Sequence, residues 1–501
     1  MFSLKPPLSR RSFLSLTGVA IGSSILPACS KNTNLQSELS SPSPLFYKPE
    51  TTGNLWDTWM YYHEGIFYLY YNPSPRGPKG LTNTWSGVAL AISSDGIHWQ
   101  EYGEVIEKPP EVVFTGAGAV WPAGDRFIMN FSEWRGPIGE DSGRQTIFFA
   151  ESRDLIHWQP LGSEYEFRQD ERWYEPNGRW DNIWSIPRPE GGYYGYWAAA
   201  PKNKQVGIGF GESDDGISWR ALPPALIEGT VPSDKAVVQG TEVSGAYYRQ
   251  GKYYVLLRPS TNLDIVTMVS DSAGGPFQPA PQNHRLMTDT TSYFLRFLDV
   301  GDDVLVNHHS WEVPLGGRLE IDPERVYLAP LKRAQWDDKG TLRLMWWEQN
   351  NLAKGKSLPI SPIKSIPGSL PLLDSLFDPQ ETLILEGMMS LPDSKDKAPT
   401  GLYIQGTGKK GTGFLVYQNG RVEYGDMSSD GSAFEKIGHA DRGLQFEEKA
   451  HFRLILKGSL TEFYLNDYLM QCYSTSEPGT GRIGFIGSES DFDELKAWYC
   501  A

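Results

Sequence analysis

The chain has 501 residues, 39% hydrophobic and 21% charged, so it carries enough apolar material for a large folded core and is neither a disordered chain nor a small disulfide-stapled one. Its formal net charge is −15, which argues against a nucleic-acid partner because phosphate binding needs a basic surface. Aromatic residues make up 13%, and the 52 glycines and 36 prolines that accompany them are typical of many short strands joined by turns.

Residues 1–29 resemble a bacterial export signal. The pair Arg10-Arg11 precedes an apolar run of about 11 residues, as in twin-arginine signals, and a membrane-spanning helix would take roughly 20. The run ends in Leu26-Pro27-Ala28-Cys29, which resembles the lipobox of bacterial lipoproteins and implies cleavage before Cys29 and a lipid on that cysteine. We therefore expect an exported protein that is anchored to a bacterial membrane, in the periplasm or at the cell surface, with residues 30–45 as a flexible tether.

The middle of the chain repeats a turn followed by an aromatic-rich strand, at intervals of about 50–65 residues. An Asp-x-x-x-Trp element follows each of the first three copies, at Asp95, Asp154 and Asp215. We expect these acids to fix turns and the tryptophans to pack between repeats, so they are not catalytic candidates. Five copies of an all-strand unit predict a five-bladed β-propeller. The copies are residues 65–71, 125–131, 191–197, 251–257 and, more weakly, 302–308.

The pattern changes after the fifth copy. Residues 350–380 are rich in proline and serine and indicate a surface linker, and from residue 381 strand-like segments return without the 60-residue period. Turn signals such as Asn419-Gly420 join them. The sequence thus predicts an all-β chain, with a five-bladed β-propeller over residues 46–349 and a C-terminal β-sandwich over residues 381–501. No helical period repeats between the strands, which argues against an α/β fold.

Two cysteines remain besides the lipidation candidate. In an oxidising compartment Cys472 and Cys500 could form a disulfide, and two buried thiols are the equal alternative. Neither has a second Cys or His at metal-site spacing, so we expect no metal site and no cofactor. The sequence leaves the oligomeric state open.

Three acids precede three of the five repeated strands. Asp57, Asp181 and Glu242 lie 8, 10 and 9 residues before the turns of their copies. The innermost strands of a propeller line its axis, so we expect these side chains to form one carboxylate cluster. Cleavage of a glycosidic bond uses such a cluster, because one carboxyl must be protonated and another ionised. The alternative is that each acid pairs with an arginine or caps a turn.

Several residues near the acids are candidates for binding a sugar. Flat tryptophan faces suit sugar rings, although blade packing is the alternative for at least half of them. Arg179 is a further candidate, with a surface ion pair as its alternative. His308 and His309 alternate in their strand, so only one can point at the axis. The substrate-contact candidates are Trp56, Trp59, Trp121, Trp134, Arg179, Trp184 and His308.

The order of these motifs resembles glycoside hydrolase family 32, the invertase, levanase and inulinase group. Residues 54–60, 85–99 and 114–120 are similar to its first-blade nucleophile motif, its next characteristic stretch and its second-blade entry. Arg179-Trp180-Asp181 stands where the family has Arg-Asp-Pro, and Thr241-Glu242-Val243 where it has Glu-Cys. The family's Asn-Asp-Pro-Asn is absent around Asp57, Trp180 alters the second motif, and no Cys follows Glu242.

The resemblance implies a retaining hydrolase that releases fructosyl or related furanosyl units from oligo- or polysaccharides. It makes Asp57 the nucleophile, Glu242 the acid/base and Asp181 the stabiliser of the transition state. The neighbouring family 43, which acts on arabinan and xylan, shares the propeller and three acids and would make Asp57 a base that acts through water, with inversion. A third hypothesis is a non-catalytic carbohydrate-binding lipoprotein that serves a transporter or sensor.

Overall fold

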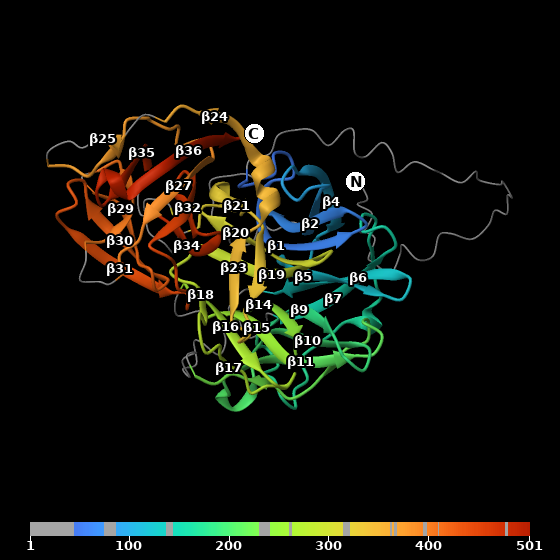
Figure 1. Cartoon of the computed structure of the whole chain (residues 1–501). Helices are drawn as coiled ribbons and strands as arrows, with labels where there is room; N and C mark the ends of the chain where they lie inside the picture. Colours follow the sequence, from blue (N-terminus) through green and yellow to red (C-terminus); the bar gives the residue numbers. More distant parts are fainter. Residues whose placement is uncertain are drawn as a thin grey trace, which may run out of the picture. The chain divides into compact units, whose positions relative to one another are not determined.

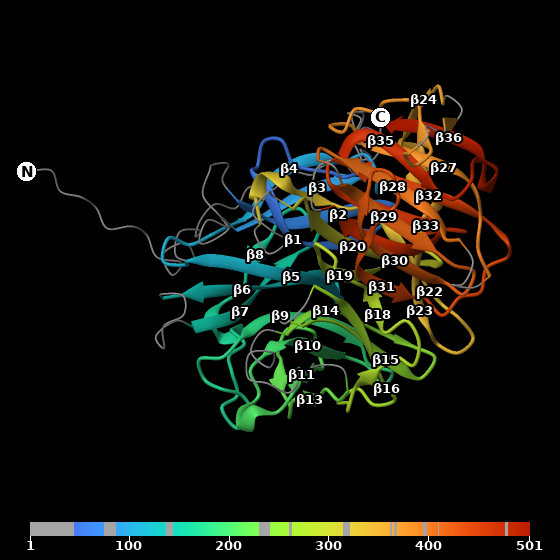
Figure 2. The ribbon, with the colours of Figure 1, turned by 90° about the vertical axis from the view of Figure 1, so that its left-hand side faces the viewer.

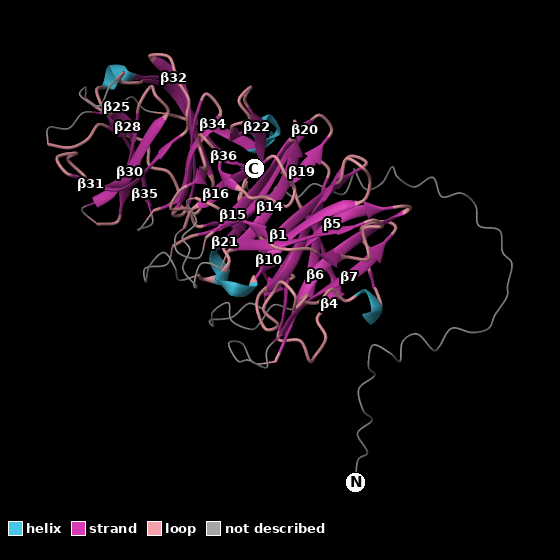
Figure 3. Ribbon diagram, turned by 90° about the horizontal axis from the view of Figure 1, so that it is seen from below, coloured by secondary structure: helices cyan, strands magenta, loops and turns pink. Residues whose placement is uncertain are grey.

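The computed structural model describes residues 45–74, 87–136, 144–229, 241–259, 263–313, 321–360, 363–364, 368–393, 398–408, 410–475 and 479–501 (Figure 1). The expected signal and its Cys29 lie outside these residues, as do nearly all of the expected tether and Trp85-Ser86 of the family-like stretch. Strands dominate the described part, and its helices are short 3-10 segments (Figure 3). None of those helices has the length and apolar character needed to cross a membrane. The segments are η2 (Ser163–Tyr165), η3 (Lys202–Lys204), η4 (Pro323–Arg325), η5 (Glu348–Ala353) and η6 (Glu489–Asp491).

The first part of the chain is the expected five-bladed propeller. Each blade is an antiparallel sheet in chain order, and the repeated aromatic strand of the sequence is the second strand of every blade. Blades one and two contain β1 (Asn54–His63), β2 (Ile66–Ser74), β3 (Gly87–Ser93), β4 (Gln100–Glu107), β5 (Phe114–Ala123), β6 (Arg126–Arg135), β7 (Arg144–Ser152) and β8 (Gln159–Pro160).

The remaining blades follow the same plan, each with one extra short strand. Blade three contains β9 (Trp180–Pro187), β10 (Tyr193–Ala199), β11 (Gly207–Ser213), β12 (Arg220–Ala221) and β13 (Ala225–Leu226). Blade four contains β14 (Glu242–Arg249), β15 (Lys252–Arg258), β16 (Ile265–Ser270), β17 (Gln278–Pro279) and β18 (Arg285–Met287). Blade five contains β19 (Ser292–Val300), β20 (Asp303–Trp311), β21 (Val326–Leu328), β22 (Lys332–Trp336) and β23 (Leu342–Trp346).

The blades close into a ring. The first strands β1, β5, β9, β14 and β19 contact one another in chain order, and β19 also contacts β1 (Figure 2). The segment before blade one reinforces the closure, because Tyr47 forms an antiparallel bridge with Leu328 of blade five. The innermost strands of all five blades therefore surround one axis, as the sequence predicts.

The Asp-x-x-x-Trp elements have the structural role expected from the sequence. Oδ1 of Asp95 accepts hydrogen bonds from the backbone N–H groups of Ile97 and His98, both at 2.8 Å. Asp154 and Asp215 accept the corresponding backbone bonds in the next two blades. The tryptophans pack between blades, and Trp219 of blade three lies edge-on against Trp121 of blade two at 5.8 Å.

The C-terminal part is the expected β-sandwich, with its core between two sheets. Its first sheet continues blade five, because Met345 of β23 pairs with Tyr468 of β34. That sheet contains β24 (Lys354–Leu358), β27 (Leu383–Ser390), β32 (Lys449–Lys457), β33 (Leu460–Leu465), β34 (Tyr468–Ser474) and β36 (Phe492–Cys500). The second contains β25 (Ile363–Lys364), β26 (Leu372–Leu373), β28 (Thr400–Gly406), β29 (Lys410–Val416), β30 (Arg421–Ser428), β31 (Phe434–Asp441) and β35 (Gly479–Ile486).

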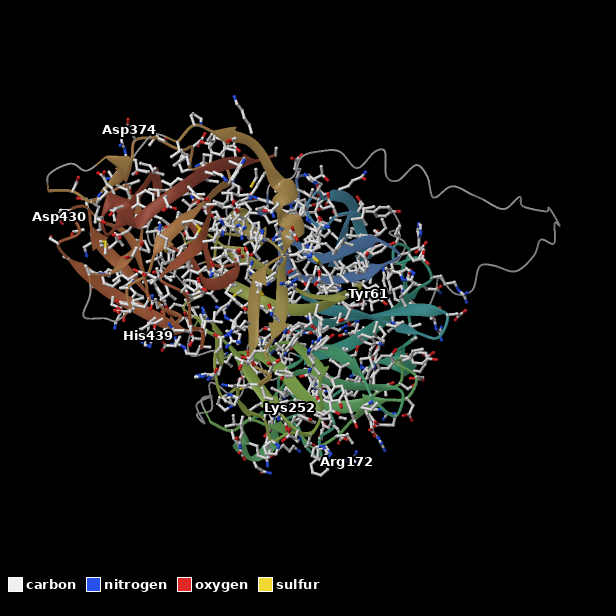
Figure 4. The ribbon with its side chains drawn as sticks, in the orientation of Figure 1. Tyr61, Arg172, Lys252, Asp374, Asp430 and His439 are labelled. Atoms are coloured by element: carbon white, nitrogen blue, oxygen red, sulfur yellow. The ribbon has the colours of Figure 1, made fainter. Side chains whose placement is uncertain are left out.

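The expected linker over residues 350–380 contains sandwich strands. β24 pairs with β36 in the first sheet, and β26 pairs with β35 in the second. The prolines of this segment lie between or after its short strands and not within them. Cys472 and Cys500 are free thiols and do not form a disulfide. In Figure 4 the labelled Asp374, Asp430 and His439 lie with the sandwich strands.

A buried arginine joins the sandwich to blade four. Nε and Nη2 of Arg442, which follows β31, donate to the Met470 carbonyl at 3.0 and 2.7 Å. Its Nη1 donates to Oδ1 of Asn283 and to the carbonyls of Arg285 and Leu286 at 2.9–3.1 Å. The charge is thus satisfied by neutral acceptors from both parts of the chain, which fixes the sandwich against the propeller.

We predict that Asp95→Ala lowers the stability of the propeller without changing its fold. The change leaves two backbone N–H groups without their acceptor, which costs about 1–3 kcal/mol of unfolding free energy. Chemical denaturation measures the effect. Asp125→Ala is the control, because it removes only a surface ion pair with Arg153 whose side chains are 73% and 78% exposed. Equal stability of the two variants would contradict the structural role of Asp95.

Candidate active site

Every inner strand has a β-bulge near its start. One extra residue interrupts the pairing of the first and second strands in each of the five blades. Three residues at these bulges have left-handed backbone angles, namely Asp57 (φ 44°), Asn182 (φ 28°) and Phe294 (φ 48°). A bulge bends its strand and changes the direction of the neighbouring side chains. In each blade the bulge thus interrupts the regular pleat of the inner strand at one position.

The three acids occupy successive positions around this bulge rather than one position of the repeat. Asp57 is in the bulge of blade one, and Asp181 directly precedes the bulge of blade three. Glu242 is two residues before Ser244, the extra residue of blade four. The spacing counted in the sequence correctly places the acids near the starts of the inner strands. It does not place them at equivalent positions of the blades. All three side chains are nonetheless buried and act on one another electrostatically, so the expected cluster exists.

Arg179 joins two of the acids. Its Nη2 is 2.7 Å from Oδ2 of Asp181 and 2.8 Å from Oε2 of Glu242, and its Nη1 is 2.8 Å from Oε1 of Glu242. The bidentate contact with Glu242 is the strong form of such a pair. Burial alone would lower the pKa of Arg179, but the carboxylates of Glu242 and Asp181 raise it above its usual value. The expected alternative of a surface ion pair is therefore wrong for Arg179, which belongs to the acid cluster.

Asp181 is fixed from a second side. Ser132 of blade two donates a hydrogen bond of 2.6 Å to its Oδ1, and Gln145 donates to Ser132 at 3.1 Å. Gly116 makes room for this contact, because a Cβ there would lie 2.4 Å from Oγ of Ser132 and 3.1 Å from Oδ1 of Asp181. With both oxygens bound to donors, the Asp181 carboxyl group is fixed in position.

Asp57 is much less constrained by hydrogen bonds. Its side chain is buried, and Oδ1 makes no hydrogen bond within the described residues. Burial and the nearby Asp181 raise the pKa of Asp57 well above its usual value, and Arg296 opposes this rise. A buried carboxylate with a free oxygen can attack an electrophile or remove a proton from water.

Glu242 is the second acid of the cluster whose pKa lies above its usual value. Burial raises its pKa, Asp181 adds to the rise, and Arg179 opposes it. Tyr293 of blade five donates a hydrogen bond to the same carboxylate. Arg179 and Tyr293 therefore both bind a carboxyl group whose pKa burial raises.

The predicted tryptophans divide into two groups. Trp56 lies beside the cluster, with its ring stacked on that of Tyr293 at 5.7 Å, and Trp134 is partly exposed and stacks on Phe114 at 6.1 Å. Sugar contact stays a prediction for these two. For Trp59 and Trp121 it is wrong, because their side chains are used in packing between blades, and for Trp184, which lies against Arg296, it also stays a prediction. Trp59 is fully buried on Tyr70, Trp121 donates to the Gly216 carbonyl, and Trp184 donates to the Ala246 carbonyl beneath the Arg296 guanidinium.

The histidine pair also alternates as expected, but the other member faces the site. His309 lies 4.7 Å from the Trp56 ring and 5.7 Å from Tyr293. His308 faces the sandwich, where it forms a buried cluster with Glu462 and Cys472, so its predicted sugar contact is wrong. Although these three residue types can bind a metal, the Lys332 ammonium already lies 2.6 Å from Glu462 and supplies the positive charge there.

Sequence reasoning missed most of the blade-five contribution. Tyr293 bonds Glu242, and Arg296 is the charge that opposes the two carboxylates around Asp57. Arg258 of blade four lies over the Tyr293 ring at 4.8 Å and donates to the Ser292 carbonyl at 2.5 Å. The available signal was an arginine inside the otherwise apolar run of residues 293–298, since an isolated charge is rarely buried without a partner.

Several solved fructosyl hydrolases are similar to the chain in structure. The chain aligns with a family 32 β-fructofuranosidase of Bombyx mori at 16% identity, covering 91% of this chain and 93% of that one with a TM-score of 0.66. Sucrose-6-phosphate hydrolase of Lactobacillus gasseri aligns at 13% identity. The alignment covers 93% of this chain and 94% of that one, with a TM-score of 0.68. Fructan 1-exohydrolase IIa of Cichorium intybus aligns at 13% over 92% and 98%, with a TM-score of 0.61. At such identities the likeness establishes the fold.

Similarity in sequence is limited to a short segment. A probable arabinan endo-1,5-α-L-arabinosidase C of Aspergillus fumigatus is 32% identical over 84 residues, which are 16% of this chain and only a quarter of that relative. No family model matches the chain.

We predict that Gly116→Ala disturbs the acid cluster more than the fold. The new Cβ would displace Ser132 or the Asp181 carboxylate, and a misplacement of about 1 Å at a reacting centre costs about 10²-fold in rate. Steady-state kinetics on a cleaved furanoside and thermal melting measure the two effects. Gly274→Ala is the control, because the nearest atom to its Cβ is 3.3 Å away on Phe210. Full activity of Gly116→Ala would contradict the proposed packing of Asp181.

Proposed function

We propose that the protein is a glycoside hydrolase that cleaves fructosyl or related furanosyl units from oligo- or polysaccharides. The observation that carries this proposal is the gathering of Asp57, Asp181 and Glu242, from three blades, around one axis with different hydrogen-bond environments. Glycoside cleavage requires such a difference, because an acid and an ionised carboxylate must coexist. The fold shared with fructosyl hydrolases supports the choice of a furanosyl substrate.

Each carboxylate suits one role in this reaction. Asp57, with an oxygen free of hydrogen bonds, would attack the anomeric carbon. Glu242 would protonate the leaving oxygen and then activate water, and its raised pKa keeps the acid form present to higher pH. Activity would therefore fall as the pH rises through the pKa of Glu242. Asp181, held by Ser132 and Arg179, would stabilise the positive charge that develops on the sugar ring.

Two other functions have some support. The short match with an arabinan-cleaving enzyme favours an inverting hydrolase in which Asp57 acts through water. The absence of the family's Asp-Pro contexts favours a non-catalytic carbohydrate-binding protein. Product stereochemistry and turnover distinguish these alternatives from the retaining enzyme.

We expect hydrolysis of at least one of sucrose, inulin, levan, arabinan or an aryl furanoside, with net retention in the first product. Asp57→Asn and Glu242→Gln should each lower kcat by about 10³-fold while the near-ultraviolet circular dichroism stays native, because each change removes a reacting group and keeps the side-chain volume.

The matched control is Asp264→Asn, an equally buried acid of blade four that binds Arg285 at 2.7 Å. It should reduce stability more than kcat. Inversion would support the family-43-like mechanism. Oligosaccharide binding without any turnover, unchanged in Asp57→Asn, would refute the enzyme.

We also propose that the mature protein is anchored outside the cytoplasm by a lipid on Cys29. The support is the sequence alone, in which Arg10-Arg11, a short apolar run and Leu26-Pro27-Ala28-Cys29 follow in order. In a bacterial host, the chain should fractionate with membranes and incorporate labelled fatty acid, and Cys29→Ala should remove the label. Lysine replacement of Arg10-Arg11 should keep the protein in the cytoplasm. A wild-type chain that incorporates no label would exclude the anchor.

A further inference from the structure

Arg296 of β19 is a completely buried arginine without a direct carboxylate partner. Its guanidinium lies over the rings of Phe294 and Trp184 at 4.5 and 5.2 Å, and Nη1 donates to Oδ1 of Asn182 at 3.2 Å. Nε and Nη2 make no hydrogen bond within the described residues. Buried donors are rarely left in this state, so the position of Arg296 calls for a functional explanation.

The Asp57 carboxylate is the strongest charge acting on this guanidinium. Burial lowers the pKa of Arg296 to about 10, and Asp57 is the largest opposing influence, ahead of Asp181 and Glu242. Asp57 in turn has Oδ1 free of hydrogen bonds. The two side chains therefore attract each other through space. Within the described residues, Oδ1 of Asp57 and Nε and Nη2 of Arg296 make no hydrogen bond.

The two site arginines thus neutralise their carboxylates in different ways. Arg179 grips Glu242 through two direct contacts of 2.8 Å and also binds Asp181. A direct bidentate contact of this kind occupies the lone pairs of a carboxylate and would make it a poor nucleophile. A positive charge that acts through space favours the ionised carboxylate without occupying its oxygen with a hydrogen bond.

We propose that Arg296 is the positioning residue of Asp57, a buried counter-charge that favours the ionised form of this carboxylate and leaves its Oδ1 atom free of hydrogen bonds. The proposal assigns a further residue to the site of the proposed hydrolase and rests on that function. The other titratable groups around Asp57 come from neighbouring elements and are Arg179 before β9, Asp181 of β9, Glu242 of β14, Tyr293 of β19 and, behind Trp56, His309 of β20. Burial lowers the pKa of His309 well below its usual value, so it adds no charge.

The first test is the pH dependence of kcat/KM for Arg296→Gln. Asp57 must be ionised to react, so activity is lost as the pH falls through its pKa. Removing Arg296 raises that pKa, and the acidic limb should move up by about one pH unit or more, with about a tenfold loss of rate per unit below it. Arg296→Lys keeps a charge and should restore most of the limb. An acidic limb within 0.2 units of wild type would overturn the proposal.

The control is Arg442→Gln. Arg442 is also buried with its pKa lowered by burial to about 10, but it binds neutral acceptors at the junction with the sandwich. Its replacement should lower the melting temperature and leave the acidic limb unchanged. A shift in both variants would mean that loss of stability, and not the charge near Asp57, moves the profile.

The second test needs no enzymatic activity, so it separates failure of this proposal from failure of the hydrolase function. In a double-mutant cycle of melting temperatures, Asp57→Asn should be more stabilising in the Arg296→Gln background than in wild type, because the counter-charge is then missing. Additive effects would overturn the proposal. If Arg296→Gln does not fold, recovery of folding in the double variant supports the proposal, and failure of both variants refutes it.

Discussion

Three carboxylates buried around one axis repel one another, and the site depends on how this repulsion is compensated. Arg179 neutralises Asp181 and Glu242 by direct contacts, and Arg296 acts on Asp57 through space. Arg179 and Asp181 belong to blade three, whereas Asp57, Glu242 and Arg296 come from blades one, four and five, so the charges meet only when these four blades come together. Formation of the site therefore requires a closed ring, which makes ring closure a condition for chemistry as well as for folding.

The closure is reinforced at two places away from the acids. Tyr47 bridges to Leu328, which joins the segment before blade one to blade five, and Arg442 binds blade four to the sandwich. Blade five itself continues into a sandwich sheet through Met345 and Tyr468. The blade that supplies Tyr293 and Arg296 is consequently the one most firmly held by the C-terminal part of the chain. The sandwich thus supports the acid cluster without supplying any of its three acids.

The sequence was sufficient for the fold and for the three acids, because both are recorded in local repeats. Turn-plus-aromatic elements mark the second strand of every blade, and acids near the start of three inner strands lie close to a shared axis. The sequence could not distinguish a tryptophan beside the acids from one between blades, since Trp56 and Trp59 differ only by a bulge whose position no local pattern reveals. It also did not reveal which of His308 and His309 faces the site, because neighbouring residues of a strand point to opposite faces. Arg296 was missed because the carboxylates that act on it come from other blades and lie far from it in the sequence.

The bulges have a consequence for how such a site can change. Each blade offers a bent backbone position whose geometry is set by strand pairing and not by the residue that occupies it, since Asp57, Asn182 and Phe294 all adopt it. The residue at a bulge and the strand pairing that forms the bulge can therefore change independently. A substitution can replace the residue at one bulge, or an acid can move by one position along its strand, while the bulges of the other four blades stay unchanged. Recognisable sequence motifs can then disappear while the three-dimensional arrangement of acids persists.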